Sequence, residues 1–345
     1  MPRILFGVSP VGLGHATRAL VLARELMRRG ADVRLFSGGK AAAFLKGKGF
    51  QVDDIVGVPI LRIANGTMSQ VSLWYLTSWL AHRRTLGRTG KLVDDYRPDL
   101  VIGDEEFSGV TVAGDRGIRR VFIADELGLG FARSWLARRL ERRVEGWYSN
   151  LQRSVDLLIV PEEGEDHGNC LYVGPIVRPA TMSCPETRTK YGIPGGRVVL
   201  FSMSGSGVGR ELGNALLAAI QDAGLNDVSL VVTGNRGARV MGERVYDLGL
   251  VEDNQNIIAC ADVVVSNAGK STIDEAAAAG TPIITIPIRH HVEQERNAAA
   301  LGYTYADLRR LSQLVAEKIG KKGTSRQFRG EVAAADAIFL LLRRP

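Results

Sequence analysis

Short apolar runs alternate along the chain with longer segments in which apolar positions recur at helical spacing. Clear examples of the runs are Arg3 to Val8, Val198 to Ser202 and Val263 to Ser266, each followed by a glycine-containing turn and a helical pattern. Strands that are apolar at nearly every position are typical of parallel sheets covered by helices on both faces. Because the pattern restarts midway along the chain, it predicts an α/β protein with two domains.

The densest part of this pattern lies between Asp262 and Asn297. It predicts a buried strand, a tight Asn-Ala-Gly turn that includes Asn267, a helix from Ser271 to Ala279 and a second buried strand from Pro282 to Pro287. A polar loop and a further helix follow.

The turn into the first of these helices has the features of an anion site. Gly269 stands where the strand must turn sharply, and Lys270, Ser271 and Thr272 follow at the helix N-terminus. Free backbone N–H groups and the helix dipole favour an anion at such a terminus. We therefore expect a phosphate group to bind there.

Further along the same stretch, polar side chains suit a sugar and a ribose. Glu275 falls one turn into the helix, where a carboxylate can accept two hydrogen bonds from a diol. His291, Gln294 and Glu295 lie close together on the following loop and can bind hydroxyl groups. The alternative is an ordinary βα unit in which Glu275 is a solvated helix residue.

The N-terminal strand leads into a second glycine-rich turn, from Val11 to Gly14, and then a helix that begins at His15. The turn nearly matches a dinucleotide-binding loop, but Thr17 replaces the third glycine and the next strand ends at Ser37 without an acidic residue. NAD is therefore disfavoured. His15 is a candidate general base or hydrogen-bond donor, at a helix start that lowers the pKa of an imidazole. A helix cap or a packing residue is the alternative interpretation.

Two acidic pairs follow predicted strands in the first half of the chain. They are Asp104 with Glu105, and Asp125 with Glu126. Ligands of open α/β sheets bind at the carboxyl ends of strands, so these carboxylates are placed for chemistry. They could instead cap the helices that follow them.

A Gly-Pro-rich segment from Leu171 to Pro179 separates the two α/β patterns and is typical of an interdomain hinge. We therefore expect an N-terminal domain at 1–170 and a C-terminal domain at 171–325. The chain ends in an amphipathic helix at 326–345 with an apolar face, and the family resemblance given below implies that this helix packs back on the first domain.

The composition is that of an ordinary globular protein, with 345 residues, 45% hydrophobic and 23% charged. No apolar run reaches the roughly 18 residues of a membrane span, and Pro10, Gly12 and Gly14 interrupt the start in a way that a signal peptide is not interrupted. We expect a cytoplasmic protein. Its three cysteines indicate neither a disulfide framework nor a zinc site.

The net charge of +7, from 44 basic and 37 acidic residues, is unevenly distributed. One predicted helix combines an aromatic and apolar face with six arginines: Arg133, Arg138, Arg139, Arg142, Arg143 and Arg153. A second run, Val71 to Arg88, has Trp74 and Trp79 next to Arg83 and Arg84. Such segments can lie on an anionic membrane surface, or their aromatic residues can be core and their arginines a solvated face. No nucleic-acid-binding motif accompanies the charge, so nucleic acid is not expected as a partner.

Four segments carry a resemblance to a known family: 12–18, 174–178, 204–210 and 267–297. At these positions the chain resembles the GT-B glycosyltransferases, most closely the bacterial lipid II-forming N-acetylglucosaminyltransferases and their archaeal relatives. The resemblance implies a GT-B fold, in which two Rossmann-like α/β domains face each other across a cleft.

The resemblance also implies roles for individual residues. The donor diphosphate would bind Arg178 and Ser206, a backbone segment at Val251 would read the nucleobase, and Glu275 would hold the ribose. His15 or Asp125 would take the proton from the acceptor, with Asp104, Glu105 and Glu126 on the acceptor side. The full donor set is Gly14, Arg178, Ser204, Gly205, Ser206, Asn235, Val251, Asn267, Gly269, Lys270, Ser271, Thr272, Glu275, His291, Gln294 and Glu295. No metal or other cofactor is implied beyond the UDP-sugar substrate.

The chain departs from the family pattern in three places. Glu295 follows Gln294 where the lipid II-forming enzymes have consecutive glutamines. Glu126 and Leu127 stand where the family has amide side chains, and the N-terminal loop lacks the family's run of glycines. These departures concern the donor sugar and the acceptor rather than the nucleotide.

The expected function is that of a hexosyltransferase. It would move N-acetylglucosamine or a related hexosamine from a UDP-sugar to a lipid-linked acceptor in cell-envelope or glycan precursor synthesis, on the inner face of the cell membrane. Two alternatives share the expected fold: a non-hydrolysing UDP-sugar 2-epimerase, and a nucleotide-sugar-binding subunit without catalysis.

Overall fold

The computed structural model describes residues 1–57, 62–64, 67–69, 71–124, 135–203, 209–234 and 241–343. The chain forms two compact units. Unit 1 consists of Met1–Leu61, Gln70–Val177 and Phe328–Pro345, and unit 2 of Arg62–Ser69 and Arg178–Gln327. The chain therefore passes from unit 1 to unit 2 within the Gly-Pro-rich segment, and its last helix returns to unit 1.

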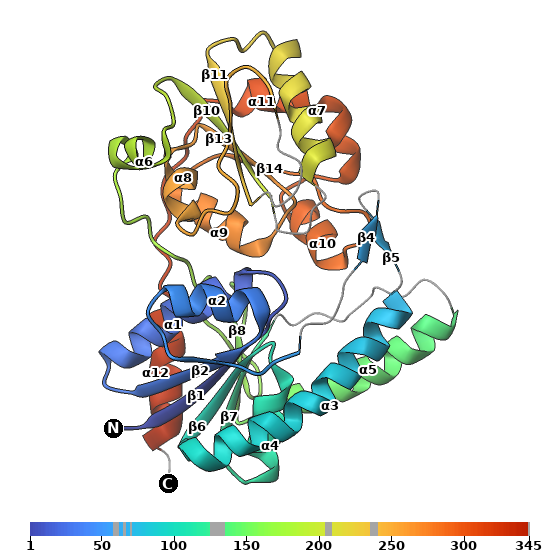
Figure 1. Cartoon of the computed structure of the whole chain (residues 1–345), viewed down its shortest axis with the longest axis vertical. Coiled ribbons are helices and arrows are strands. Elements are labelled where there is room, and N and C mark those ends of the chain that lie inside the picture. Colours follow the sequence, from blue (N-terminus) through green and yellow to red (C-terminus); the bar gives the residue numbers. More distant parts are fainter. Residues whose placement is uncertain are drawn as a thin grey trace. The chain divides into compact units, whose positions relative to one another are not determined.

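Unit 1 is built on a parallel sheet (Figure 1). The strand order is β3-β2-β1-β6-β7-β8-β9. The strands are β1 (Arg3–Val8), β2 (Asp32–Ser37), β3 (Val52–Asp54), β6 (Leu100–Asp104), β7 (Arg119–Ile123), β8 (Leu157–Val160) and β9 (Cys170–Tyr172).

Helices cover both faces of this sheet (Figure 1). One face carries α1 (Gly14–Arg28), α2 (Gly39–Gly47) and α12 (Gly330–Arg343), and the other carries α3 (Val71–Tyr96), α4 (Phe107–Asp115) and α5 (Trp135–Ser154). Successive strand residues point to opposite faces, so Ile4 and Phe6 pack in one core cluster while Leu5 packs in the other. Burial on both faces explains why the strands are apolar at nearly every position.

Unit 2 repeats this architecture with a parallel sheet in the order β12-β11-β10-β13-β14. Its strands are β10 (Arg197–Ser202), β11 (Val228–Thr233), β12 (Val245–Asp247), β13 (Val263–Ser266) and β14 (Ile283–Thr285). One face carries α7 (Gly209–Asp222), α10 (Val292–Ala300) and α11 (Leu311–Lys318), and the other carries α6 (Cys184–Tyr191), α8 (Asn254–Cys260) and α9 (Lys270–Ala279). The antiparallel pair β4 (Arg62–Ala64) and β5 (Thr67–Ser69), and the 3-10 helix η1 (Tyr305–Arg310), complete the elements of this unit.

Each sheet has a point at which the strand order reverses. In unit 1 this point lies between β1 and β6, where Val8 pairs with Asp104. In unit 2 it lies between β10 and β13, where Ser202 pairs with Ser266. Open α/β sheets bind ligands outside the carboxyl ends of the strands at such points. The chain segments that follow Val8, Asp104, Ser202 and Ser266 are therefore the places to look for a site.

The α/β class predicted from the hydrophobic pattern is confirmed. The strand Val263–Ser266 is observed as predicted, and the helix that follows begins at Lys270, one residue earlier than predicted, and ends at Ala279.

The expectation of no disulfide is wrong. Cys184, at the start of α6, and Cys260, at the end of α8, form one, and their Cα atoms are 5.1 Å apart. The two helices pack against each other, a proximity that a separation of 76 residues along the chain does not reveal. Cys170 is buried and lies outside this disulfide.

Candidate active site

The switch point of unit 1 brings together a histidine and two carboxylates. His15 lies in the first turn of α1, and Asp104 is the last residue of β6. The His15 Nδ1 atom is 2.9 Å from Asp104 Oδ1, and the His15 Nε2 atom is 3.6 Å from Glu105 Oε2. The structure thus assembles one of the two candidate bases with two of the predicted acceptor-side residues.

Arg18, one helical turn after His15, fixes the buried carboxylate. Its Nε donates to Asp104 Oδ2 at 2.8 Å and its Nη2 to Oδ1 at 2.5 Å. Burial would raise the pKa of Asp104, but the charge and hydrogen bonds of Arg18, together with the hydrogen bond from His15, hold it at about 2. Asp104 is therefore an ionised anchor with a solvent exposure of 0%. Arg18 was not among the predicted site residues, although its spacing from His15 places both on one face of a helix.

His15 has the opposite pKa shift from the one expected at a helix N-terminus. Burial lowers its pKa, but the charge of Glu105 and the hydrogen bond and charge of Asp104 outweigh burial and the repulsion from Arg18. The pKa is raised to about 9. The sequence-based expectation of a lowered pKa is therefore wrong, because two carboxylates distant along the chain act more strongly than the helix dipole.

The backbone beyond β6 turns back sharply. Glu105 adopts a φ of +43°, which is uncommon for a residue with a Cβ atom. Gly103 allows the turn, because a Cβ atom there would lie 2.3 Å from the carbonyl oxygen of Glu106. Glu106 then caps α4: its carboxylate accepts hydrogen bonds from the backbone N–H groups of Ser108 and Gly109 and from the Ser108 hydroxyl. The helix cap in this segment is Glu106, a residue that sequence reasoning did not single out.

In unit 2 the turn between β13 and α9 lies at the switch point. Ala268 takes the left-handed conformation of the turn, with φ +59°, whereas Gly269 is the N-cap of α9 with φ −69°. No side chain caps the first turn of α9. Lys270 Nζ binds the Asp274 carboxylate at 2.6 and 2.7 Å, and Ser271 and Thr272 are half-buried.

Glu275 and Arg178 form a largely buried ion pair in unit 2. Arg178 Nε and Nη2 both lie 2.8 Å from Glu275 Oε1, and Arg178 Nη1 donates to the Glu252 carbonyl oxygen at 2.8 Å. The side chains are 11% and 5% exposed. Burial raises the pKa of Glu275, and Arg178 opposes that shift. The residues predicted for the ribose and the diphosphate are thus direct neighbours.

The predicted sugar-binding residues accept hydrogen bonds from backbone N–H groups in and near the loop before α10. His291 is the N-cap of that helix and accepts from the Gln294 backbone N–H at 3.5 Å. Burial lowers the pKa of His291, which favours the neutral ring required of an acceptor. Gln294 Oε1 accepts from the Ile288 N–H and Glu295 Oε1 from the His290 N–H.

Asn267, at the end of β13, donates from Nδ2 to the Ile286 carbonyl oxygen. Its Oδ1 atom is buried and has no hydrogen-bond partner among the residues that the structure describes. Buried polar atoms without a partner are uncommon in folded proteins, and each calls for an explanation such as a ligand or an ordered water. This acceptor lies in the turn that leads to Gly269.

A polar link that the sequence did not indicate joins three elements of unit 2. Asn254, at the start of α8, donates from Nδ2 to the Ser202 hydroxyl and accepts at Oδ1 from the Thr233 hydroxyl, both at 2.9 Å. Ser202 and Thr233 are the last residues of β10 and β11. Val251, the predicted nucleobase reader, is half-buried shortly before α8. These hydrogen bonds connect the ends of β10 and β11 with the start of α8 near the switch point.

Several predicted residues lie outside the described part of the chain: Asp125, Glu126, Ser204, Gly205, Ser206 and Asn235. Gly14 is the first residue of α1. In the part of the chain that the structure describes, no group of three or more His, Cys, Asp or Glu side chains could hold a metal ion. Nor is any helix within the described ranges long and apolar enough to cross a membrane.

Two family models match the chain. Residues 2–126 match glycosyl transferase family 1, and residues 225–326 match the glycosyltransferase family 28 C-terminal domain. The first match covers the β1–α1 and β6 segments of unit 1, and the second covers Glu275 and the loop before α10.

Relatives that match most of this chain are also named as sugar transferases. An uncharacterized glycosyltransferase of Methanosarcina acetivorans is 25% identical over 87% of this chain and 83% of its own length. A UDP-N-acetylglucosamine--N-acetylmuramyl-(pentapeptide) pyrophosphoryl-undecaprenol N-acetylglucosamine transferase of Yersinia pseudotuberculosis is 25% identical over 82% of this chain and 76% of its own. Among solved structures, the glycotransferase of kitacinnamycin superposes with a TM-score of 0.69 at 18% identity, covering 99% of each chain.

The fold and these matches define the class of the protein: it is a glycosyltransferase of the GT-B type. Its N-terminal part is similar to glycosyl transferase family 1 and its C-terminal part to family 28. The predicted enzyme class, a hexosyltransferase, is thereby confirmed. Glycosyltransferases of this type bind nucleotide-sugar donors.

Proposed function

We propose that this glycosyltransferase moves N-acetylglucosamine or a related hexosamine from its UDP derivative to a lipid-linked acceptor at the inner face of the cell membrane. The single observation that carries the donor assignment is the Glu275–Arg178 pair beside the turn of α9. It combines a carboxylate for a diol and a guanidinium for a diphosphate within one ion pair.

We assign the donor to unit 2. Arg178 contacts only Oε1 of Glu275 in the ion pair, so Oε2 is the oxygen that would accept from ribose hydroxyls. The uncapped N-terminus of α9 would receive a phosphate group. A Cβ atom at Gly269 would meet no heavy atom of the described residues within 4 Å, which leaves room there for a ligand to approach the backbone. The matched relative of Yersinia, whose name includes UDP-N-acetylglucosamine, supports UDP as the nucleotide.

We assign the acceptor to unit 1 and the proton transfer to His15. Asp104 occupies Nδ1 and leaves Nε2 as the ring atom that can face an acceptor hydroxyl. A buried carboxylate behind an imidazole fixes its tautomer and stabilises the imidazolium that forms when it takes a proton. Asp125 remains the alternative base, at a position outside the described residues.

A surface of unit 1 supports a membrane-bound acceptor. Trp79 and Leu80 on α3 and Trp147 on α5 are 53%, 43% and 41% exposed. Arg83 lies over the Trp79 ring at 5.1 Å, and His82 joins the two helices by contacting Trp147. The same two helices carry eight exposed arginines: Arg83, Arg84, Arg88, Arg138, Arg139, Arg142, Arg143 and Arg153.

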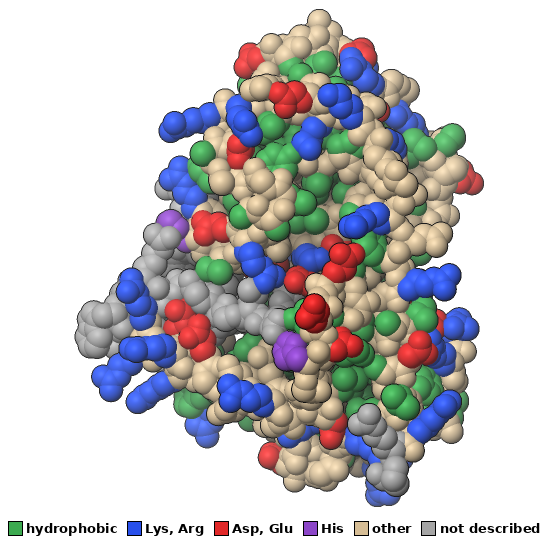
Figure 2. Space-filling model, turned by 180° about the vertical axis from the view of Figure 1, so that it is seen from behind, with side chains coloured by type: hydrophobic (Ala, Val, Ile, Leu, Met, Phe, Trp, Pro, Cys, Tyr) green, Lys and Arg blue, Asp and Glu red, His purple; other side chains and the backbone are tan. Residues whose placement is uncertain are grey.

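Figure 2 shows Lys and Arg side chains gathered at the lower left, the side of unit 1 that carries α3 and α5. Aromatic side chains next to several cations favour the boundary between water and an anionic lipid surface. Tyr148 and Leu151, on the other side of α5, are buried in the core. The helix therefore combines a packed face with a cationic exposed one.

The transfer reaction is tested with radiolabelled UDP-N-acetylglucosamine and a solvent extract of membrane lipids that contains polyprenyl-linked saccharides. We expect the label to move into the lipid phase together with release of an equal amount of UDP. A UDP-sugar epimerised in the absence of lipid, or label that never leaves the aqueous phase, would contradict the proposal.

A further inference from the structure

Glu105 occupies an unusual position next to the proposed base. It follows the last residue of β6, its N–H donates to the Ile123 carbonyl oxygen at 3.0 Å, and its φ is +43°. Residues held in this region of the backbone map cluster at functional sites, where the surrounding structure maintains them. The hydrogen bond to β7 and the space made by Gly103 hold Glu105 in this conformation. Its side chain is directed at His15.

The two ring nitrogens of His15 face different kinds of carboxylate. Nδ1 contacts Asp104, which is 0% exposed and held by Arg18, whereas Nε2 contacts Glu105, whose side chain is 31% exposed. Among the described residues, the charged groups that face the ring are Asp104 at the end of β6, Glu105 directly after it, and Arg18 on its own helix. Asp104 is thus a fixed partner, and Glu105 is the partner that an incoming molecule can reach.

The contact of Glu105 with Nε2 does not suit a histidine that acts as a general base before the acceptor binds. A base needs a free electron pair on Nε2, but a carboxylate at 3.6 Å favours a proton on that atom. The raised pKa of His15 agrees with this geometry. A ring that carries a proton on Nε2 has no free electron pair on that atom, and it cannot activate water.

We propose that Glu105 is a positioning residue that holds the Nε2 proton of His15 until the acceptor hydroxyl takes its place. The proposal rests on the proposed function, because it takes His15 as the base. It makes the base available only when acceptor is bound, and it protects the donor from hydrolysis when acceptor is absent. Among the predicted residues, Glu105 thereby gains a specific role.

One proton leaves the site for each acceptor hydroxyl that reacts. When the acceptor displaces Glu105, the Nε2 proton passes to the Glu105 carboxylate, which leaves a neutral imidazole. In the transfer step the acceptor O–H bond breaks and its proton goes to Nε2. The bond between the acceptor oxygen and the sugar C1 forms, and the bond from C1 to the diphosphate oxygen breaks with its electron pair on the nucleotide. Glu105 then releases its proton to water and returns to the imidazolium.

The first test requires no substrate. The His15 ring is followed by NMR through a pH titration in the wild type and in Glu105→Gln, with His15→Gln identifying the signal. We expect Glu105→Gln to lower the His15 midpoint by at least one pH unit, a tenfold loss of proton affinity. A change below about 0.3 units would overturn the proposal, since that is well under the one-unit scale on which a neighbouring charge shifts a pKa.

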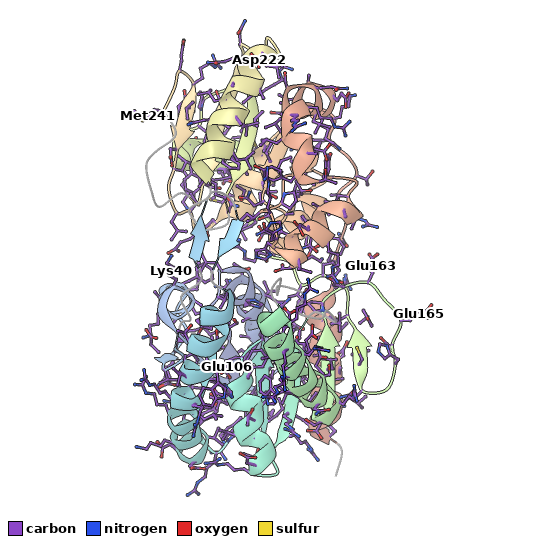
Figure 3. All side chains as sticks on the ribbon, turned by 90° about the vertical axis from the view of Figure 1, so that its right-hand side faces the viewer. Lys40, Glu106, Glu163, Glu165, Asp222 and Met241 are labelled. Atoms are coloured by element: carbon purple, nitrogen blue, oxygen red, sulfur yellow. A yellow bond between two sulfur atoms is a disulfide. The ribbon has the colours of Figure 1, made fainter. Side chains whose placement is uncertain are left out.

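Two further variants serve as controls. Glu163→Gln removes the same charge from an exposed residue beyond β8 that points away from the sheet (Figure 3), and we expect it to leave the titration unchanged. Glu105→Asp keeps the charge on a shorter side chain, so its midpoint should lie above that of Glu105→Gln. Should Glu105→Gln not fold, the Asp variant decides: a midpoint that equals the wild-type value despite the shorter reach contradicts the contact.

The second test uses UDP-N-acetylglucosamine without acceptor and measures whether Glu105 suppresses hydrolysis of the donor. We expect Glu105→Gln to release UDP by hydrolysis several times faster than the wild type, and the acid limb of its pH profile to move to lower pH. Equal UDP release from both proteins would overturn the proposed protection of the donor from hydrolysis, even if the titration shows that Glu105 contacts His15. Because the NMR titration uses no donor, a wrong donor assignment affects only the second test.

Discussion

The charge of His15 depends on its tertiary neighbours. The sequence places it at a helix start, and local physics there would lower its pKa. Asp104 and Glu105, about ninety positions away along the chain, reverse the shift. The histidine itself could be predicted from the glycine-rich turn before it. Its charge could not, because that depends on which strand end lies next to β1.

The raised pKa of His15 makes a contribution to stability that depends on pH. The folded-state pKa of about 9 exceeds the ordinary value of 6.5, so this contribution is fully present below pH 6.5 and is lost as the pH rises through 9. We expect the free energy of unfolding of the wild type to exceed that of His15→Gln by more at pH 6 than at pH 9.5, by urea denaturation. His167→Gln, at an exposed surface position, controls for loss of an imidazole. An equal difference at both pH values would contradict the ion pairs.

At the scale of elements, sequence reasoning located β13 and α9 to within a residue. The apolar run of β13 lies between Asp262 and Asn267, and α9 lies between Gly269 and Gly280, so polar and glycine residues mark both ends of each element. The helix cap of α4 was not predicted, because three successive acidic residues stand at 104–106 and the pattern does not tell them apart. The turn that Gly103 allows gives each of them a separate role. Asp104 is the buried anchor, Glu105 contacts His15, and Glu106 caps α4.

The cap itself is testable. Glu106 is 3% exposed and satisfies two backbone N–H groups and one hydroxyl in the first turn of α4 (Figure 3). We expect Glu106→Ala to lower the free energy of unfolding by about 1–3 kcal/mol, because buried donors lose their partners. Glu163→Ala, at an exposed position, should change it by less than about 0.5 kcal/mol. Equal effects of the two substitutions in chemical denaturation would show that the cap is not significant.

The contact between Arg178 and Glu275 depends on how the elements of unit 2 are arranged. Arg178 lies in the Gly-Pro-rich segment, at the start of the longer part of unit 2, Arg178–Gln327, while Glu275 lies in α9. The sequence predicted a role for each residue but not their direct contact. Two residues that are 97 positions apart meet because Arg178 also binds the Glu252 carbonyl oxygen just before α8, and α8 packs against α9.

At the scale of the whole molecule, the basic and aromatic surface of α3 and α5 predicts binding to lipid. We expect the protein to float with vesicles that contain anionic lipid at low salt, and to dissociate as salt screens the arginines. Replacing Trp79 and Trp147 with serine should weaken binding at every salt concentration. Leu340→Ser removes a 59% exposed apolar side chain from α12 instead, and should have no effect. Binding that neither salt nor the tryptophan substitutions reduce would contradict this surface assignment.

The central claim is that unit 2 binds the nucleotide part of a UDP-sugar donor through Glu275, and a thermal unfolding experiment with UDP tests it most directly. A ligand that binds only the folded state at about 100 times its Kd stabilises that state by about 2.7 kcal/mol. UDP should therefore raise the Tm of the wild type and of Glu243→Gln, an exposed carboxylate of the same unit. It should raise the Tm of Glu275→Gln much less, because losing a charged hydrogen-bond partner weakens binding by about tenfold or more. A wild-type Tm that UDP leaves unchanged, or an equal increase in all three proteins, would contradict the account.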